Sequence, residues 1–205
     1  MENKFTPEER ETLESYGKVA EIWDERNPCH WKDELWYAFA SRLPDGARVL
    51  DLGCGTARDA EFFLTEGFRY VGVDFSLPML QVAARHLLVP FLGMNIGELA
   101  FRSESFDAFW ATTSFMHVPR KKLPFVLGEV QRVLKPKGIG FISIPSGTFE
   151  GMYEGQGSFR DVGSKTLCVC WPPEDLEAVL VASGFTVLKW IPIAYMLYFI
   201  VQREQ

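Results

Sequence analysis

Residues 48–59, with the sequence RVLDLGCGTARD, join a short apolar run to a glycine-rich turn. A tight turn of this kind between a strand and a helix lets backbone N–H groups approach a ligand closely. Further along, the run YVGVDFS carries an acid, Asp74, at the end of the next apolar stretch. An acid on the neighbouring strand can bind a ribose. The two features together predict a site for a ligand that contains a nucleoside.

The apolar pattern alternates between predicted strands and helices along most of the chain. The strands are short and largely apolar and helices separate them, which is the pattern of a parallel sheet that is buried on both faces and has right-handed crossovers. We expect helices at residues 7–24, 31–43, 59–66, 78–88, 121–134 and 173–183, strands at 48–52, 70–74, 90–93, 108–111 and 138–144, and two closing strands within 185–204.

Length and composition indicate one globular domain over residues 1–205, because 47% of the residues are hydrophobic and such a chain can bury a substantial core. The net charge of −6 argues against a nucleic-acid partner, which a basic surface would serve better. The polar, acidic start is unlike a signal peptide and no apolar run is long enough to span a bilayer, so we expect a cytoplasmic protein without membrane attachment.

The four cysteines lack the paired spacing of a zinc site, and a disulfide framework is not expected in the cytoplasm. In the run KTLCVCW, alternation puts Cys168 and Cys170 on one face of a predicted strand. We therefore interpret them as reduced thiols that pack like small hydrophobic groups.

Four segments together resemble the class I S-adenosylmethionine-dependent methyltransferases: VLDLGCGTA, VGVDFS, FDAFWATTSFMHV and EVQRVLKPKGIGFISI. The resemblance covers roughly residues 16–205. It is strongest to the small-molecule enzymes, whose motif reads acid-x-Gly-x-Gly-x-Gly; here the positions hold Asp51, Gly53, Gly55 and Ala57. A methyl group at Ala57 should fit if the local backbone keeps ordinary helical angles. A dehydrogenase fingerprint would need Gly or Ala where Arg58 stands.

The resemblance implies an α/β, Rossmann-like three-layer sandwich with a mainly parallel seven-stranded sheet and an antiparallel final strand. Residues 1–46 would form an N-terminal helical lid and residues 47–205 the cofactor-binding core. It also implies S-adenosylmethionine as the methyl donor and S-adenosylhomocysteine as the product. The sequence gives no reason to expect a metal ion.

For the cofactor, the resemblance implies that the backbone of Gly53, Cys54 and Gly55 lies against the amino-acid end. Asp51 would help to hold the ammonium group, directly or through water. Asp74 would accept hydrogen bonds from both ribose hydroxyls.

Further cofactor contacts follow the next strands. Phe75 would cover one adenine face, or simply pack. Asn95 stands where the family often has an Asp that binds the adenine amino group, although it could equally be a turn residue, and Ile96 would supply a backbone amide. Ala111 and Thr112 would lie beside the methionine portion.

In the N-terminal helices, Tyr16, Trp23 and Trp31 resemble parts of the family's lid, with Tyr16 expected to contact the cofactor, although any of these aromatic residues could belong to the core. His117 lies just beyond a predicted strand end and is the candidate general base, with a structural or capping role as the alternative.

The glycine-rich residues 145–165 are the least regular part of the sequence, and we expect them to cover the substrate or to form a solvated connector. In this loop Tyr153 and Arg160 are candidate substrate contacts, with a surface salt bridge as the alternative for Arg160.

The expected reaction is direct in-line transfer of a methyl group to a small-molecule acceptor by a protein taken as a monomer. Positioning is the main catalytic device in this mechanism, and a base is needed only for a protonated nucleophile. Two alternatives remain, a regulatory or partner protein that binds S-adenosylmethionine without turnover, and a nucleotide-dependent oxidoreductase. The sequence does not identify the acceptor atom.

Overall fold

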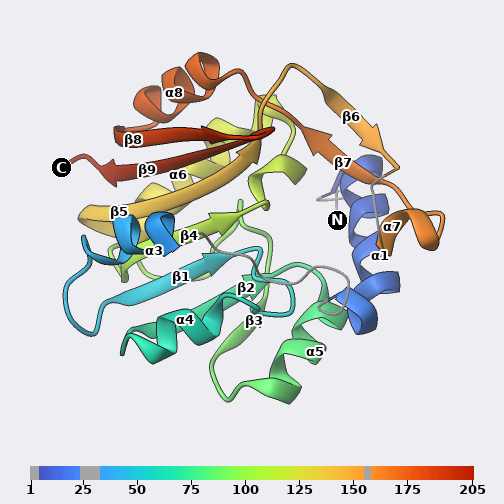
Figure 1. The fold of residues 1–205 in the computed structure, drawn as a ribbon, viewed down its shortest axis with the longest axis horizontal. Coiled ribbons are helices and arrows are strands. Elements are labelled where there is room, and N and C mark those ends of the chain that lie inside the picture. Colours follow the sequence, from blue (N-terminus) through green and yellow to red (C-terminus); the bar gives the residue numbers. More distant parts are fainter. Residues whose placement is uncertain (1–4, 24–32, 155–157) are drawn as a thin grey trace.

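A seven-stranded sheet forms the centre of the computed structural model, which describes residues 5–23, 33–154 and 158–205 (Figure 1). The strand order is β3-β2-β1-β4-β5-β9-β8. The strands are β1 (Arg48–Leu52), β2 (Arg69–Asp74), β3 (Phe91–Gly93), β4 (Phe106–Thr112), β5 (Leu134–Pro145), β8 (Phe185–Ile193) and β9 (Met196–Arg203). Strands β1 to β5 pair in parallel, whereas β9 is antiparallel to both of its neighbours. The predicted α/β fold with a final antiparallel strand is confirmed.

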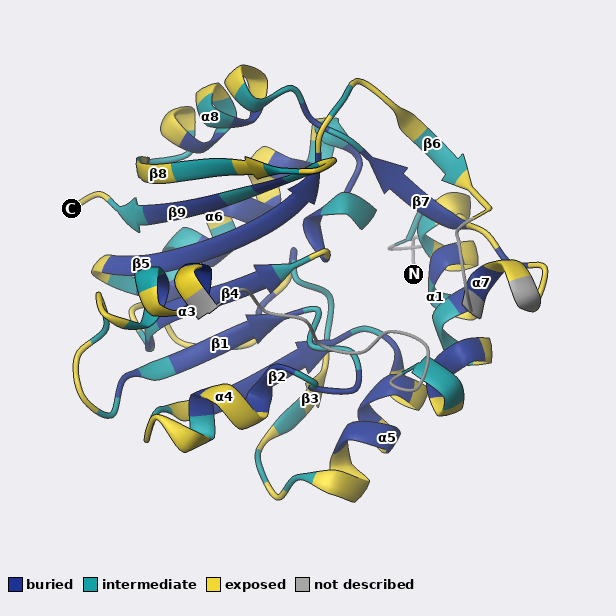
Figure 2. Ribbon diagram, viewed as in Figure 1, coloured by how far each residue is buried: buried dark blue, intermediate teal, exposed yellow. Residues whose placement is uncertain are grey.

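Helices cover both faces of this sheet, and the strands between them are mostly buried (Figure 2). One face packs against α3 (Asp33–Ala40) and α4 (Ala60–Thr65), and the other against α6 (Leu123–Val133) and α8 (Pro173–Ala182). The remaining helices are α1 (Pro7–Val19), α5 (Leu77–His86), α7 (Ser158–Asp161) and the short 3-10 helices η1 (Ala20–Ile22), η2 (Phe115–His117) and η3 (Arg120–Lys122). The result is the expected three-layer sandwich.

Aromatic side chains fill the α3 and α4 face of the sheet. Trp110 stacks on Phe141 with ring centroids 4.0 Å apart, and Trp36, Phe39 and Phe63 pack around this pair. These five side chains are buried. Aromatic pairs add to the free energy gained from area burial alone, so this cluster fixes α3 and α4 against β4 and β5.

The last two strands form a hairpin that confirms the predicted division of the apolar C-terminal run. Strand β8 ends at Ile193, Ala194 takes a positive φ of 55°, and β9 begins at Met196. Pro192 lies within β8, which has a neighbour on one side only. An edge strand tolerates proline because one of its sides makes no ladder hydrogen bonds.

A second, two-stranded sheet lies apart from the first and alongside α1 and α7 (Figure 1). It pairs β6 (Glu150–Tyr153) with β7 (Thr166–Val169) in antiparallel register. The sequence predicted an irregular loop over much of this segment. The structure differs because β6 finds its backbone partners in β7, a long-range pairing that the local pattern does not reveal.

Helix α1 begins at Pro7 with a capping box, in which the Thr6 hydroxyl accepts from Glu9 N–H and the Glu9 carboxylate accepts from Thr6 N–H. Its inner face is attached to β7 by hydrogen bonds. The Thr12 hydroxyl accepts from Leu167 N–H at 2.8 Å, and the Ser15 hydroxyl donates to the Lys165 carbonyl at 2.6 Å. Trp31, an expected lid residue, lies outside the described residues.

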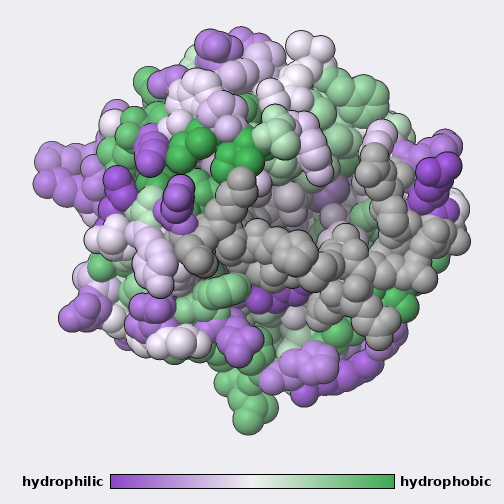
Figure 3. All heavy atoms as spheres, viewed as in Figure 1, coloured by the Kyte–Doolittle hydropathy of each residue, from purple (hydrophilic) through white to green (hydrophobic). Residues whose placement is uncertain are grey.

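Hydrophilic and hydrophobic side chains are interspersed over the face of the molecule drawn in Figure 3. Within the described ranges, we find no helix with the length and apolar character needed to cross a membrane.

Candidate functional site

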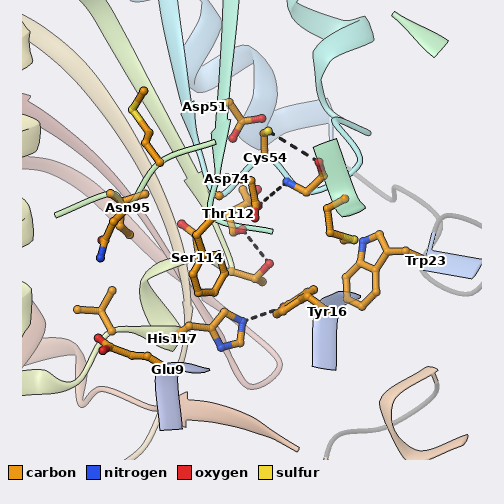
Figure 4. Close-up of a pocket in the computed structure, with 18 of the residues that line it drawn as sticks. Glu9, Tyr16, Trp23, Asp51, Cys54, Asp74, Asn95, Thr112, Ser114 and His117 are labelled. Carbon is orange, nitrogen blue, oxygen red and sulfur yellow. Dashed lines mark hydrogen bonds between the residues drawn. The ribbon is translucent and has the colours of Figure 1, made fainter. Parts of the chain in front are cut away.

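A pocket opens where the carboxyl ends of β1, β2 and β4 meet α1 and η2 (Figure 4). The empty space in it is about 930 Å³, with the open solvent at its mouth included. All the predicted cofactor residues except Ala111 line it, as does His117; they are Tyr16, Asp51, Gly53, Cys54, Gly55, Asp74, Phe75, Asn95, Ile96 and Thr112.

The glycine turn forms the floor of this pocket. Gly53 and Gly55 have positive φ angles of 75° and 55°, which glycine adopts without steric cost. A Cβ atom on Gly53 would lie 2.5 Å from the Cβ of Ser114, so this turn has no room for a side chain. The N–H groups of Gly53 and Cys54 both donate to the Val73 carbonyl and hold the turn against β2.

Ala57, at the third motif position, does not keep helical angles. Its φ is 61°, in the left-handed region, so the expectation of ordinary helical angles at this residue is wrong. The left-handed conformation costs an L-residue roughly 1–2 kcal/mol. The side chain is nonetheless buried against the aromatic face of the sheet, which offsets part of that cost.

Asp74 joins the glycine turn to the end of β2. One carboxylate oxygen accepts from Gly55 N–H at 2.8 Å, and the other accepts from Ser76 N–H at 2.7 Å. Burial raises the pKa of this carboxyl group, while the backbone donors oppose that rise. A carboxylate has about four lone-pair positions, so these two bonds leave Asp74 able to accept more.

Two further acids lie at the same end of the sheet. Asp51 accepts from the Tyr70 hydroxyl at 2.6 Å, and burial together with the nearby Asp59 raises its pKa well above the usual range. Asp59 accepts from Trp110 Nε1 at 2.8 Å and from the Thr112 hydroxyl at 3.1 Å. Such a concentration of carboxylates favours a cationic ligand.

Sequence reasoning did not select Asp59. The signal was its position just before a helix that follows the glycine turn, where it is the N-cap residue of α4. Arg58, Ser114 and Met79 also line the pocket and were not predicted. Ser114 lies in the segment FDAFWATTSFMHV, which the sequence singles out, but the sequence does not show that this residue lines the pocket.

On the side of the pocket near β3, the Asn95 side-chain carbonyl accepts from Gly97 N–H at 2.9 Å. This bond closes a local turn of the kind that Asn commonly forms. It agrees with the turn role weighed for Asn95, and contact with a ligand stays a prediction. Phe75 lies 6.0 Å from Phe5, centroid to centroid, at the same end.

His117 is engaged on both ring nitrogens. Its Nδ1 lies 2.6 Å from the Leu167 carbonyl oxygen and its Nε2 lies 2.8 Å from the Tyr16 hydroxyl. A carbonyl can only accept, so Nδ1 carries the proton and Nε2 accepts from Tyr16. Removal from water lowers the His117 pKa to about 4, and the Leu167 carbonyl opposes this only in part. The imidazole is therefore neutral at neutral pH.

The two candidate substrate contacts lie away from this pocket. Tyr153 is 45% exposed in β6, Arg160 is exposed on α7, and neither belongs to the pocket lining. Ala111 is fully buried in the core beside the pocket. The roles predicted for these three residues stay predictions.

The cysteines within the described residues are free thiols. Cys168 Sγ and Cys170 Sγ lie 4.0 Å apart, on one face as alternation predicts. Burial and the neighbouring Cys170 raise the pKa of Cys168 to about 12, so its thiol stays protonated. Cys29 lies outside the described residues.

Comparison with known proteins finds methyltransferases similar to this chain. Residues 49–138 match the family described as "Methyltransferase domain". The chain is 32% identical over 140 residues to a demethylmenaquinone methyltransferase of Clavibacter sepedonicus, a match that covers 60% of this chain and 56% of that one. It is 33% identical over 144 residues to a ubiquinone biosynthesis O-methyltransferase of Dechloromonas aromatica, a match that covers 64% and 61%. The chain thus spans less than two thirds of the length of these relatives.

The fold is also similar to solved structures. The Burkholderia thailandensis 1,6-didemethyltoxoflavin-N1-methyltransferase, solved with bound 1,6-didemethyltoxoflavin and S-adenosylhomocysteine, aligns with a TM-score of 0.73 at 19% identity. That alignment covers 100% of this chain and 94% of the other. A putative methyltransferase of Haloferax volcanii, solved in complex with the Trm112 methyltransferase activator, aligns with a TM-score of 0.72 at 18% identity, covering 96% and 97%.

Proposed function

We propose that this chain, which belongs to the class I S-adenosylmethionine-dependent methyltransferase family, binds S-adenosylmethionine in the described pocket and transfers its methyl group to a small-molecule acceptor. The observation that carries the proposal is the contact between the glycine turn and Asp74, through Gly55 N–H. It supports a nucleoside site because a glycine turn and an acid placed to bind a ribose meet at one sheet edge.

The residues present fit this cofactor. Gly53 has no side chain, so an aminocarboxylate can lie close to its backbone. Asp51 and Asp59 offer carboxyl oxygens for the ammonium group, whose positive charge would favour the ionised form of Asp51, and Asp74 offers free lone pairs for the ribose hydroxyls. In this proposal Phe75 and Ile96 bound the adenine, and Thr112 lies beside the methionine portion.

When bound, the cofactor supplies a methyl group on a positively charged sulfur: the acceptor's lone pair forms the new bond to carbon, and the carbon–sulfur electrons pass to sulfur. The chain's own contribution is positioning and the exclusion of water. Helix α1 acts as the lid in this proposal because it borders the pocket through Tyr16. The buried carboxylates favour binding of the positively charged cofactor over its uncharged-sulfur product.

The names of the relatives support a small organic acceptor of the quinone type for this chain too. We further propose a monomer that works in the cytoplasm, with residues 1–46 as the lid and residues 47–205 as the core of a single domain.

The test is calorimetric titration with S-adenosylmethionine and S-adenosylhomocysteine. We expect binding by the wild type and a loss of about 100-fold in affinity for Asp74→Ala, because hydrogen bonds to a charged group contribute roughly 1.5–3 kcal/mol each. Asp45→Ala, in an exposed turn before β1, is the matched control and should bind normally. No binding by folded wild type, or equal affinity in Asp74→Ala, would contradict the proposal.

A further inference from the structure

Aromatic side chains gather on the α1 side of the pocket, opposite the glycine turn (Figure 4). The Tyr16 ring lies 5.3 Å from Trp23, 5.3 Å from His117 and 5.0 Å from Phe159, centroid to centroid. Trp23 and Phe159 are themselves 5.4 Å apart. Tyr16 and Trp23 line the pocket, and Phe159 supports them from α7. Such a wall suits a flat, largely apolar molecule.

A directed hydrogen-bond chain ends on this wall. The Leu167 carbonyl accepts from His117 Nδ1, and His117 Nε2 accepts from the Tyr16 hydroxyl. The Tyr16 oxygen has donated its proton and keeps lone pairs with which to accept one bond more. A hydroxyl group on a molecule in the pocket can therefore donate to Tyr16.

Ser114 points independently to a polar group at this place. It lines the pocket, is only 9% exposed, and its Oγ atom has no hydrogen-bond partner within the described part of the chain. It precedes η2, the short helix that carries His117. A buried hydroxyl without a partner is costly, so a ligand atom that reached Ser114 Oγ, which is itself almost fully buried, would gain affinity from a bond to it.

The charges around the pocket select against an anionic acceptor. Asp51, Asp59 and Asp74 line it, together with Glu9, whose carboxylate is paired with Lys122, whereas Arg58 is the single Lys or Arg side chain among the described lining residues. The Arg58 guanidinium lies 5.8 Å from the centroid of Trp23. A carboxylate on the acceptor would meet more negative than positive charge.

We propose that the methyl acceptor is an uncharged aromatic molecule with a free hydroxyl group, held on Tyr16 and Trp23 and hydrogen-bonded to the Tyr16 oxygen. This inference rests on the function proposed above. As the acceptor oxygen gains the methyl group, its proton passes to Tyr16 while the Tyr16 proton passes to His117 Nε2. His117 then carries one proton on each nitrogen, and no other reagent is needed.

The neutral state of His117 is compatible with this route. A proton acceptor must be unprotonated before transfer, and a ring with a pKa of about 4 meets that condition at neutral pH. Its weak basicity is sufficient. As the acceptor hydroxyl gains the methyl group it becomes an oxonium, and an oxonium is a far stronger acid than imidazolium.

Three probes separate the elements of the proposal: catechol, its carboxylate analogue 3,4-dihydroxybenzoate, and the non-aromatic trans-1,2-cyclohexanediol. Each is incubated with wild-type protein and S-adenosylmethionine, and the O-methyl product is measured by mass spectrometry. Each is also titrated into protein saturated with S-adenosylhomocysteine. We expect catechol to bind and to be methylated, the benzoate to bind more weakly, and the cyclohexanediol to do neither.

Tyr16→Phe tests the hydroxyl, with Tyr37→Phe on the exposed face of α3 as the matched control. We expect Tyr16→Phe to lower kcat for catechol by about 100-fold and to raise the KM for catechol, because the variant loses both the proton route and the hydrogen bond to the acceptor, and we expect the control to match the wild type. His117→Gln should lower kcat in the same way, because an amide cannot take up the proton.

The outcomes separate the two proposals. If S-adenosylhomocysteine does not bind, the proposed function fails and this inference falls with it. If it binds but catechol neither binds nor reacts, or the cyclohexanediol serves equally well, the inference alone is overturned. Full kcat in a folded Tyr16→Phe variant would likewise overturn the proton route. The comparison of the three probes requires no variant, so it decides even if the variants fail to fold.

Discussion

The pocket has two halves of different construction. The sheet half consists of Asp51, Gly53, Gly55 and Asp74, which stand within one β1-turn-α4-β2 stretch of the chain. The helix half consists of Tyr16, Trp23 and His117, and its central hydrogen bond joins residues 101 positions apart. Backbone hydrogen bonds attach the sheet half to the paired strands β1 and β2. The helix half depends instead on the packing of α1 against β7.

This difference separates two ways of making a site. In the sheet half, chain direction and glycine conformation place the ligand groups, so a short motif is sufficient. In the helix half, side chains from distant segments meet because the Thr12 hydroxyl bonds to the backbone of Leu167 in β7 and the Ser15 hydroxyl to that of Lys165 just before it. We expect the sheet half to be sensitive to added atoms and the helix half to lost hydrogen bonds.

The largest expected effect comes from Gly53→Ala in the sheet half. The added Cβ would lie 2.5 Å from Ser114 Cβ at a φ of 75°, so backbone strain and a steric clash add together. We expect about 3 kcal/mol or more of lost unfolding free energy, measured by urea denaturation, and loss of cofactor binding.

Gly67→Ala is the matched control for that variant. Gly67 has a φ of 79° but no atom within 4 Å of an added Cβ, so it tests the strain alone. It should cost roughly 1–2 kcal/mol. Equal losses in the two variants would contradict the tight approach of Ser114 to the turn.

The pH dependence of stability tests the helix half. The His117 pKa is lowered to about 4 in the folded protein, so the unfolded chain takes up this proton first as pH falls. The contribution of the neutral ring is full above pH 6.5 and is lost between roughly pH 6.5 and 4, on the order of 3 kcal/mol in total.

Thermal or urea unfolding of wild type and His117→Gln across that pH range isolates this contribution, because the buried carboxylates titrate in both proteins. As pH falls from 6.5 to 4, the wild type should lose more unfolding free energy than His117→Gln. Parallel curves would mean that His117 is not held neutral in the pocket.

Thr12→Val tests the attachment of α1 to β7. The substitution keeps the side-chain shape but leaves the buried Leu167 N–H without its acceptor. We expect a loss of about 1–2 kcal/mol in unfolding free energy, and weaker acceptor binding with little change for the cofactor. Thr186→Val on β8, whose hydroxyl bonds to Glu204 at an exposed position, is the control and should be near neutral.

The smallest effect should come from Lys122→Ala, which removes an ion pair with Glu9 on α1. The Nζ and carboxylate oxygen lie 2.8 Å apart, but the lysine side chain is 36% exposed. Exposed pairs contribute roughly 0.2–1 kcal/mol and are screened by salt. Unfolding at low and high salt should show a small loss that shrinks as salt is added; a loss as large as that of Thr12→Val would contradict this ranking.

The sequence by itself determined the sheet, its closing hairpin and the sheet half of the pocket. Short apolar strands between helices allow few arrangements. The glycine motif with Asp74 depends on local backbone geometry, which can be inferred without the distant contacts. The same local reasoning failed at Ala57, because its left-handed φ is tolerated only by the packing around it.

The sequence named Tyr16, Trp23 and His117, but only the tertiary structure decided how they meet in the helix half. It formed β6 where the sequence predicted an irregular loop and paired it with β7, which lies in a segment predicted as a strand. It also kept Tyr153 and Arg160 out of the pocket and brought Tyr16 to His117. Long-range partners of this kind leave no periodic mark in the sequence, because a hydroxyl or an imidazole is equally acceptable on a solvated helix. Only the docking of α1 on β7 removes those groups from water and makes their hydrogen bonds necessary.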